Sequence, residues 1–278
     1  MPSSKIKIGL QNLIKIYGDQ PNTALQLFRA GKTRDEILHL TNHVISIADI
    51  SLEINQGELF VIMGLSGSGK STLIRCINRL IEPTSGHIYL DGEDIAHINE
   101  KRMRSLRLRK ISMVFQQFGL FPHKTVVENV AYGLKMRGMS PVKRRQKSLA
   151  TLARVGLEQW ADRFPADLSG GMKQRVGLAR ALATDAEILL MDEPFSALDP
   201  LIRREMQQQL LRLQQELQKT IIFISHDIHE AFKLGDRIGI MKEGKIVQVG
   251  IPEVILNQPA NDYIRAFLQD IYDLRNLI

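Results

Sequence analysis

The chain has 278 residues, 44% of them hydrophobic, which is enough for one large globular unit with a substantial core, and its single cysteine, Cys76, excludes an internal disulfide. The longest apolar runs are strand-sized, far short of the roughly 20 residues that a membrane-spanning helix needs, and the N-terminus has no apolar segment of the secretory type, so we expect a cytoplasmic protein. A formal charge of +7 suits nucleic acid, an anionic lipid surface or phosphate ligands and does not choose among them.

The first predicted elements are two strands separated by helices. Residues 6–17 and 44–54 alternate between apolar and polar side chains, as strands do. Residues 18–42, between them, are polar at both ends and have helical spacing inside, which predicts one or two short helices. The continuous apolar run at 59–63 is typical of a strand buried on both faces of a parallel sheet.

Strands and helices continue to alternate along the rest of the chain, which indicates an α/β core. The further predicted strands are 87–90, 111–115, 188–191, 221–225, 238–241 and 245–249. The predicted helices are 70–80, 126–136, 141–155, 171–183, 201–217 and 228–233. Residues 125–168 are mostly helical and lie between two core strands, so we expect them to form an inserted helical subdomain.

A glycine-rich loop at 64–69 joins the apolar strand at 59–63 to the helix at 70–80. Residues 64–71 fit the phosphate-loop pattern G-x-x-x-x-G-K-[ST] in full and in the context that it requires. Glycines let the backbone wrap around phosphate oxygens, and the positive end of the following helix faces the anion. A glycine-rich turn without a ligand is the alternative, which the Lys, the Ser and both flanking elements disfavour.

Each residue of this loop has a predicted part in binding a nucleotide. Lys70 adds a positive charge on the outer phosphates, and the Ser71 hydroxyl is placed to hold Mg²⁺, which prefers oxygen ligands. The predicted nucleotide-binding residues here are Gly64, Leu65, Ser66, Gly67, Ser68, Gly69, Lys70, Ser71 and Thr72.

Two neighbouring acids end the predicted strand at 188–191. Asp192 can reach the Mg²⁺ shell opposite Ser71, and Glu193 then points to where a water would attack the γ-phosphate. Phosphoryl transfer depends on positioning and charge neutralisation more than on covalent chemistry. An acidic pair after a strand is usually a helix cap or a solvated turn, but the phosphate loop upstream favours the functional interpretation.

A second anion site is predicted at Ser169, Gly170 and Gly171, where a serine and two glycines open a helix. Without further context, Ser169 could simply be the N-cap of that helix. This loop resembles the signature loop of ABC ATPases, the nucleotide-binding subunits of ABC transporters. In that family the loop contacts the γ-phosphate of ATP bound to the other subunit.

Other motifs follow in the order that this family shows. Gln116 resembles the Q-loop glutamine, Asp199 lies in a segment similar to the D-loop, and His226 resembles the switch histidine beside the γ-phosphate. Tyr17 resembles the aromatic residue that stacks on adenine. For Tyr17 a core residue at a strand end is the alternative, and the segment 18–42 could displace its ring.

The resemblance implies an α/β fold with a P-loop NTPase core of RecA type, an antiparallel β subdomain and an inserted α-helical subdomain. It implies ATP and Mg²⁺ as ligands, and a second copy of the chain as a partner. The implied catalytic residues are Lys70, Gln116, Glu193 and His226. The residues implied around the metal are Ser71, Gln116 and Asp192.

A narrower resemblance is to the ATPases of glycine betaine and proline betaine importers. It rests on residues 60–72, 78–85 and 196–203, on the helical segment with Gly31 to Leu38, and on a signature that continues with Met172. It implies a separate membrane permease, an indirect solute-binding partner, a quaternary-amine osmolyte as the solute, and a peripheral location on the cytoplasmic side of the cell membrane.

Many members of that group continue into a pair of cystathionine-β-synthase regulatory modules, whereas this chain ends at Ile278 after a helical tail from about Asn261. We expect an ATPase domain over residues 1–254, a C-terminal helical tail over 255–278, and no such modules.

Two alternatives stay open. One is an importer ATPase for another small solute, because no residue of an ATPase subunit reads the solute directly. The other is a soluble ABC ATPase that acts on nucleic acid through residues 101–110, where six of ten residues are Lys or Arg. A solvated helix face is favoured for this run, because no aromatic side chains interrupt it to stack on bases, and we expect no nucleic-acid partner.

Overall fold

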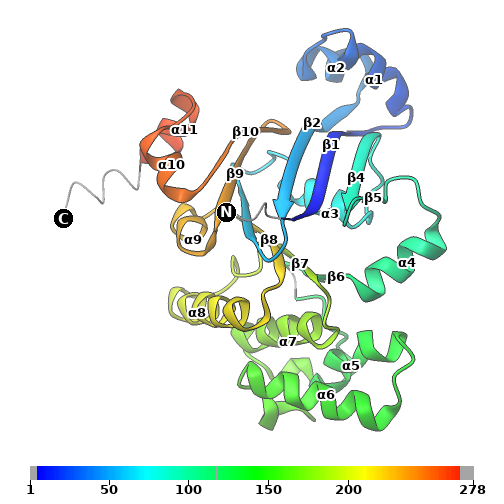
Figure 1. Ribbon diagram of the computed structural model, residues 1–278, viewed down its shortest axis with the longest axis vertical. Helices are drawn as coiled ribbons and strands as arrows, with labels where there is room; N and C mark the ends of the chain where they lie inside the picture. The colour runs from blue at the N-terminus through cyan, green and yellow to red at the C-terminus, as the bar shows by residue number, and fades with distance from the viewer. Residues whose placement is uncertain (1–4, 117, 270–278) are drawn as a thin grey trace. The chain divides into compact units, whose positions relative to one another are not determined.

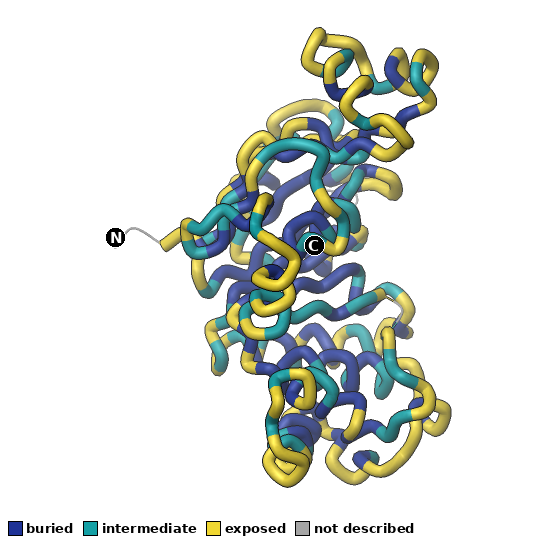
Figure 2. The backbone as a smooth tube through the Cα atoms, turned by 90° about the vertical axis from the view of Figure 1, so that its right-hand side faces the viewer, coloured by how far each residue is buried: buried dark blue, intermediate teal, exposed yellow. Residues whose placement is uncertain are grey.

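The computed structural model describes residues 5–116 and 118–269 (Figure 1), and the chain folds into two compact units. The first unit combines the residues up to Asn99 with those from Ser225 onward, and the second unit comprises Glu100–Ile224. In both units the buried residues follow the strands and the inner faces of the helices (Figure 2). No helix in the described part of the chain is long and apolar enough to cross a membrane.

The first unit contains a four-stranded antiparallel sheet in the order β2-β1-β4-β5. Its strands are β1 (Ile6–Tyr17), β2 (Val44–Asn55), β4 (Ser85–Leu90) and β5 (Glu93–Asp94). Irregularities in the β1–β2 pairing coincide with Asn12 and Asp49, whose φ angles of 47° and 63° are left-handed and whose side chains form a hydrogen bond of 3.0 Å. Asn and Asp tolerate this conformation better than other side chains, so the sequence permits the bulge.

The segment between β1 and β2 forms two helices, α1 (Pro21–Arg29) and α2 (Arg34–Thr41), as predicted. Thr33 and Glu36 cap α2 reciprocally, and the backbone and side-chain hydrogen bonds at Thr33 and Lys32 lower the pKa of Glu36 to about 2. The helices bury Ala24, Leu25 and Ile37 against apolar residues of β1 and β2. Helices this short are barely stable alone, so this packing is what stabilises the segment.

The first unit also holds the strand that leads into the phosphate loop. Strand β3 (Leu59–Met63) pairs in parallel with β9 (Arg237–Lys242), which pairs antiparallel with β10 (Lys245–Gly250). The helices of this part are α3 (Lys70–Ile77), α9 (Ile228–Leu234), α10 (Pro252–Asn257) and α11 (Asp262–Phe267). Cys76 lies in the core on α3, and burial raises the pKa of its thiol to about 12, so it acts as an apolar core residue.

The second unit places three parallel strands in the order β8-β7-β6 beside its helices. The strands are β6 (Ile111–Val114), β7 (Ile188–Asp192) and β8 (Thr220–Ser225). The helices are α4 (Glu100–Arg109), α5 (Val126–Met136), α6 (Pro141–Arg154), α7 (Gly170–Ala183) and α8 (Pro200–Leu217), with short 3₁₀ turns at Glu158–Trp160 and Pro165–Asp167. The α/β alternation predicted from the sequence is therefore confirmed.

The helices predicted between 125 and 168 form a core of their own. Apolar residues of α5, α6 and α7, such as Val130, Leu152 and Val176, are fully buried together. At the start of α5, Asn129 is 0% exposed, and its amide nitrogen donates to the carbonyl oxygens of Phe121, Lys124 and Thr125. This buried side chain fixes the loop that leads from β6 into the helices.

Some boundaries differ from the predicted ones. Helix α3 ends at Ile77 rather than at 80, because Asn78 accepts a hydrogen bond from the Leu80 amide and Arg79 takes a left-handed φ of 51°. The pattern gives no signal for β5 or α10, which are short. The predicted C-terminal helix begins as α11, and the rest of that tail, 270–278, lies outside the described residues.

The basic run at 101–110 lies almost wholly on α4, where Met103 is the buried residue. Glu100, at the start of this helix, forms ion pairs with Arg104 at 3.4 Å and with Arg107 at 3.0 Å. This part of the chain is therefore an exposed helix face with internal charge pairing, as the favoured interpretation predicts.

Candidate functional site

The phosphate loop, residues 64–71, connects β3 to α3. All five residues of β3 are buried, and the loop tip, Leu65 to Gly67, is exposed. Gly64, Gly67 and Gly69 have φ angles of 151°, 76° and 101°, which side chains with a Cβ rarely adopt. Two of these glycines also face backbone atoms at close range: a Cβ at Gly64 would lie 2.3 Å from the Met241 carbonyl oxygen, and one at Gly69 would lie 2.4 Å from the Ser46 carbonyl oxygen.

The turn between β9 and β10 forms a hydrogen bond with the phosphate loop. The Gly244 amide donates to the Ser68 carbonyl oxygen at 2.9 Å, and the Ala48 amide of β2 donates to the Gly244 carbonyl oxygen at 2.8 Å. Because these bonds come from elements distant in sequence, the fold itself fixes the shape of the loop.

Lys70 lies inside the loop. Its side chain is nearly buried, with the residue 5% exposed, and its ammonium donates to the carbonyl oxygens of Gly64 at 2.8 Å and Leu65 at 3.1 Å. The Ser68 hydroxyl is buried beside it without a hydrogen-bond partner among the described residues. A buried cation and a buried hydroxyl at a helix N-terminus suit an anion with several oxygen atoms.

Tyr17 lies at the end of β1 next to the first turn of α3. Its hydroxyl is 3.4 Å from the Thr72 hydroxyl, which also accepts a hydrogen bond of 2.9 Å from Ser46. Tyr17 is 39% exposed, and the Lys15 ammonium lies 5.1 Å from the centre of its ring. The two helices α1 and α2 therefore do not displace the ring from the phosphate loop, and its exposure disfavours the alternative of a core residue.

His226 follows β8 and belongs to the same unit as the phosphate loop. Its neighbours hold the turn rigidly: the Asp227 amide donates to the Ser225 hydroxyl at 3.0 Å, and Asp227 caps α9 by accepting from the Glu230 amide at 3.1 Å. His226 itself is exposed. The turn thus presents the imidazole to solvent at the end of a buried strand.

The acidic pair and Gln116 meet in the second unit. Asp192 ends β7 and is 1% exposed, and Glu193 follows with a left-handed φ of 45°. The Gln116 side-chain amide donates to the Glu193 carboxylate at 3.4 Å and contacts the Ser196 hydroxyl at 3.5 Å. The structure therefore brings Gln116 and Glu193 into contact.

The turn after Glu193 is built around a strained residue. A left-handed conformation costs a residue with a Cβ roughly 1–2 kcal/mol. The Ser196 hydroxyl donates to the Glu193 carbonyl oxygen at 3.0 Å, and the buried ring of Phe195 packs 5.5 Å from that of Phe223. These contacts hold the turn in place and aim the Glu193 side chain toward Gln116.

The predicted signature, Ser169 to Gly171, opens α7. The Ser169 hydroxyl accepts a hydrogen bond of 3.3 Å from the Met172 amide, so Ser169 is the N-cap, and both Ser169 and Gly170 are exposed. A Cβ at Gly171 would lie 2.5 Å from the Ile202 side chain of α8. Asp199 caps α8 in the same way, since it accepts from the Ile202 amide at 3.1 Å. Two helix N-termini are therefore close together, with exposed caps.

The sequence alone does not reveal Arg180, on α7. Its guanidinium donates to the carbonyl oxygens of Gly119 at 2.6 Å and Phe118 at 3.2 Å, and burial lowers its pKa. Arg180 thus ties the loop that follows Gln116 to the helix that carries the signature. Ser46, which bonds Thr72, is missed for the same reason: both act through contacts that are distant in sequence.

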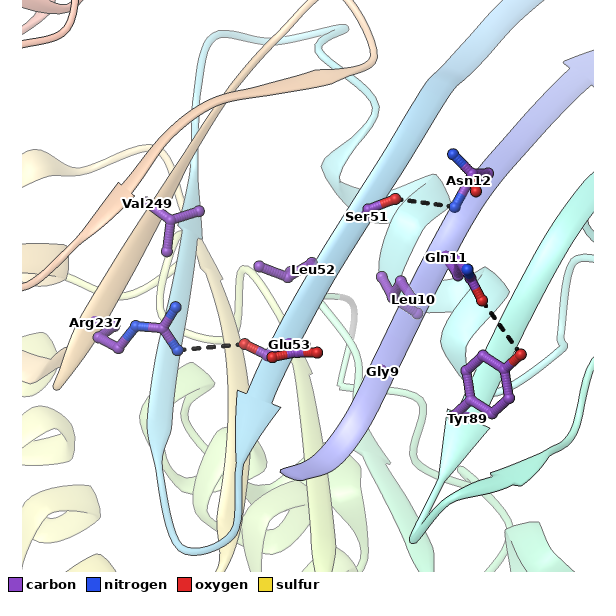
Figure 3. A pocket seen from close by; sticks show the side chains of 10 residues that line it. All are labelled: Gly9, Leu10, Gln11, Asn12, Ser51, Leu52, Glu53, Tyr89, Arg237 and Val249. Atoms are coloured by element: carbon purple, nitrogen blue, oxygen red, sulfur yellow. Dashed lines mark hydrogen bonds between the residues drawn. The ribbon is translucent and has the colours of Figure 1, made fainter. Parts of the chain in front are cut away.

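A groove in the first unit is lined by residues of β1, β2, β4, β9 and β10 (Figure 3). In the groove, Tyr89 donates to Gln11 at 3.3 Å, and the Asn12 amide donates to the Ser51 hydroxyl at 3.0 Å. None of the predicted site residues lines this groove, so it is separate from the phosphate loop.

Comparison with known proteins identifies the family. Residues 47–196 match the family model described as ABC transporter, a range that includes the phosphate loop, the signature and the acidic pair. The chain belongs to the ABC transporter family. It is 54% identical over 266 residues to the glycine betaine/proline betaine transport system ATP-binding protein ProV of Escherichia coli, which covers 96% of this chain and 66% of that protein.

Further relatives of this ABC transporter protein share the same region. The glycine betaine transport ATP-binding protein OpuAA of Bacillus subtilis is 54% identical, over 96% of this chain and 64% of its own length. The trimethylamine N-oxide transport system ATP-binding protein TmoW of Ruegeria pomeroyi is 49% identical, over 95% of this chain and 77% of its own length. The chain spans about two thirds of the length of the glycine betaine relatives that it matches. These matches confirm the narrower resemblance seen in the sequence.

Solved structures confirm the ABC ATPase fold. The dimeric structure of the bacterial ABC transporter cassette MJ0796 matches with a TM-score of 0.75 and 34% identity, over 88% of this chain and 98% of that one. A second structure of MJ0796, in a post-hydrolysis state bound to ADP and Pi, matches with a TM-score of 0.74 and the same identity.

The two glycines Gly69 and Gly67 give a direct test of the loop geometry. Gly69→Ala should lower the melting temperature more than Gly67→Ala, because both alanines have a positive φ but only the one at 69 would meet a backbone oxygen. A Cβ at Gly67 has no atom within 4 Å, so this variant measures the conformational cost alone. Differential scanning calorimetry of the two purified variants provides the comparison, and equal melting temperatures would contradict the packing described for Gly69.

Proposed function

We propose that the chain is the ATP-binding and ATP-hydrolysing subunit of an ABC importer for glycine betaine, proline betaine or a related quaternary-amine osmolyte. The observation that carries the proposal is the phosphate loop closed around Lys70, with its nearly buried ammonium 2.8 Å from the Gly64 carbonyl oxygen. A preformed loop with an internal cation binds the β- and γ-phosphates without reorganising. Tyr17, exposed beside α3, stacks on the adenine.

The oxygen atoms offered by Ser71, Gln116 and Asp192 are of the type that Mg²⁺ prefers. The nearly buried Asp192 carboxylate at the end of β7 is the negative group that such an ion would balance. When bound with ATP, Mg²⁺ neutralises charge that builds up on the phosphate oxygens.

In the proposed reaction a water molecule attacks the γ-phosphorus, the bond to the β-phosphate oxygen breaks, and ADP and inorganic phosphate leave. Glu193 orients the water and accepts its proton. The Gln116 amide, 3.4 Å from the Glu193 carboxylate, holds this group in position before the nucleotide arrives. His226 donates a hydrogen bond to the γ-phosphate, and this bond is lost when the phosphate leaves.

The site requires a second copy of the chain. Ser169, Gly170 and Gly171 are placed at a helix N-terminus where Ser169 and Gly170 are exposed, which is suited to a phosphate that comes from outside the chain. The dimeric form of the related MJ0796 cassette supports this arrangement. ATP favours the closed dimer because its γ-phosphate contacts both copies, and hydrolysis removes that bridge.

The work is coupled to transport through a separate permease, which receives solute from a solute-binding protein. The loop at 118–121, which Arg180 fastens to the signature helix, transmits the movement of Gln116 to the permease. We place the subunit at the cytoplasmic face of the cell membrane, held there by the permease. The similarity to three named betaine and trimethylamine N-oxide transport proteins supports a methylated amine as the solute.

The variants Glu193→Gln and Lys70→Ala should separate binding from hydrolysis. Glu193→Gln should keep ATP affinity within a few fold, lose at least about a hundredfold in turnover, and accumulate as an ATP-bound dimer, because only the proton acceptor is lost. Lys70→Ala should lose ATP affinity and never form the dimer. Fluorescent ATP binding, phosphate release and light scattering measure the three quantities. Wild-type turnover by Glu193→Gln would refute the role of Glu193, and unchanged ATP affinity in Lys70→Ala would refute that of Lys70.

The solute is tested by reconstitution of the chain with the permease and the solute-binding protein that this proposal assigns to it. Glycine betaine should stimulate ATP hydrolysis in proteoliposomes, and labelled glycine betaine should accumulate inside only when ATP is present. Choline, trimethylamine N-oxide and an amino acid serve as competing solutes in the same assay. Stimulation by the amino acid and none by any methylated amine would reject the proposed solute while leaving the ATPase proposal intact.

A further inference from the structure

A group of metal-ligating side chains lies outside the nucleotide site, on the antiparallel sheet of the first unit. His87 comes from β4, Asp94 from β5, and His97 from the segment directly after β5. One ligand atom from each residue lies within 4.8 Å of the other two. None of these residues belongs to the motifs of the family.

The Asp94 carboxylate is oriented by the backbone. Its Oδ1 atom accepts hydrogen bonds from the amides of Ala96 at 2.9 Å and Ile88 at 3.4 Å. This leaves Oδ2 facing His87, whose Nδ1 atom is 2.7 Å away. A carboxylate held on one oxygen by backbone amides offers the other oxygen as a single, fixed ligand.

The two imidazoles are also held in place. The His87 ring stacks on Tyr89, at the rim of the groove in Figure 3, with centroids 6.0 Å apart. The His97 ring meets the His87 ring edge-on, with centroids 5.7 Å apart and an interplanar angle of 84°. Nearby, Arg79 donates to the carbonyl oxygens of Ile95 at 3.0 Å and Ile98 at 2.8 Å, which fixes the segment that carries His97.

We propose that His87, Asp94 and His97 bind one divalent transition-metal ion, with Zn²⁺ as the reference ion. Two imidazole nitrogens and one carboxylate oxygen form a donor set that zinc and its neighbours prefer and that Mg²⁺ does not. With ligand bonds of about 2.0–2.2 Å, tetrahedral ligands lie about 3.3–3.6 Å apart, so atoms within 4.8 Å of one another need only small rotations of the side chains. Solvent reaches the site, since His87 and His97 are exposed, and water fills the remaining position.

A simple ion pair between His87 and Asp94 is the competing explanation. The ion pair accounts for the 2.7 Å contact, but it does not explain why a ligand atom of His97 lies within 4.8 Å of both other residues. The two explanations therefore differ in what His97 does. The bound ion would join β4, β5 and the segment after them, and act as a clip on this edge of the sheet.

The test uses the full chain without an affinity tag, stripped of metal and free of nucleotide, and titrated with ZnCl₂ against a chromophoric chelator. The wild type should bind one Zn²⁺ per chain, and Zn²⁺ should raise its melting temperature. His97→Ala should weaken zinc binding by about tenfold or more and abolish the thermal shift, while it keeps the His87–Asp94 contact.

His39→Ala is the matched control, because His39 is exposed on α2 and belongs to no such group. It should bind zinc as the wild type does. Equal affinities of His97→Ala and His39→Ala, or the absence of saturable binding to the wild type, would overturn the proposal. Neither result depends on ATP hydrolysis, so failure here leaves the proposed function untouched. Replacement of Zn²⁺ by Co²⁺ adds a second readout, since the visible spectrum of Co²⁺ reports nitrogen ligation in the wild type and its loss in His97→Ala.

Discussion

The nearly buried ammonium of Lys70 imposes the constraint on which the phosphate loop depends. Taking a cation out of water is costly unless oxygen atoms surround it, and the fold provides the carbonyl oxygens of Gly64 and Leu65 at 2.8 and 3.1 Å. In the same loop the backbone takes positive φ angles at Gly64 and Gly69. Those glycines in turn let the loop lie directly on the backbone of Ser46 and Met241. The buried charge of Lys70, the glycines and the close packing of the loop therefore occur together in one short segment.

The carboxylate residues of the second unit are arranged on a different principle. Glu193 is held in a left-handed conformation by a hydrogen bond from Ser196 and by the packing of Phe195 on Phe223. Gln116, which contacts Glu193, begins a loop that Arg180 fastens to the helix of the signature. A movement of Gln116 would thus be transmitted to α7 through Arg180, which lies in the last turn of that helix. Such a connection suits a proposed machine in which the state of the nucleotide must be reported to a partner.

The sequence predicts well those residues whose role depends on their neighbours in the chain. The run of apolar residues at 59–63 and the glycines after it predict a buried strand and a phosphate loop, because both features depend on neighbours in the chain. The two helices before β2 follow from periodicity, and the Thr33–Glu36 capping box seen in the structure fixes the start of α2. The end of α3 coincides with the left-handed φ of Arg79, whose guanidinium also reaches the carbonyl oxygens of Ile95 and Ile98, and no local pattern reveals that reach. Ser46, Arg180 and the His87–Asp94–His97 group are hidden for the same reason, since pairing of distant segments creates them.

The central claim is that each nucleotide site is shared between two copies of the chain. Lys70→Ala would inactivate the phosphate loop of one copy. Gly170→Asp would place a negative charge at the exposed start of α7 in the other copy. The nearest atom to the new Cβ at position 170 is 4.0 Å away, so this substitution leaves the packing intact. Each variant alone should be inactive. A mixture in equal amounts should recover up to about a quarter of the wild-type ATPase rate, because about half of the random pairings join unlike copies and each mixed pair keeps one of its two sites intact. If the mixture shows no more activity than the two variants do separately, the shared site is contradicted.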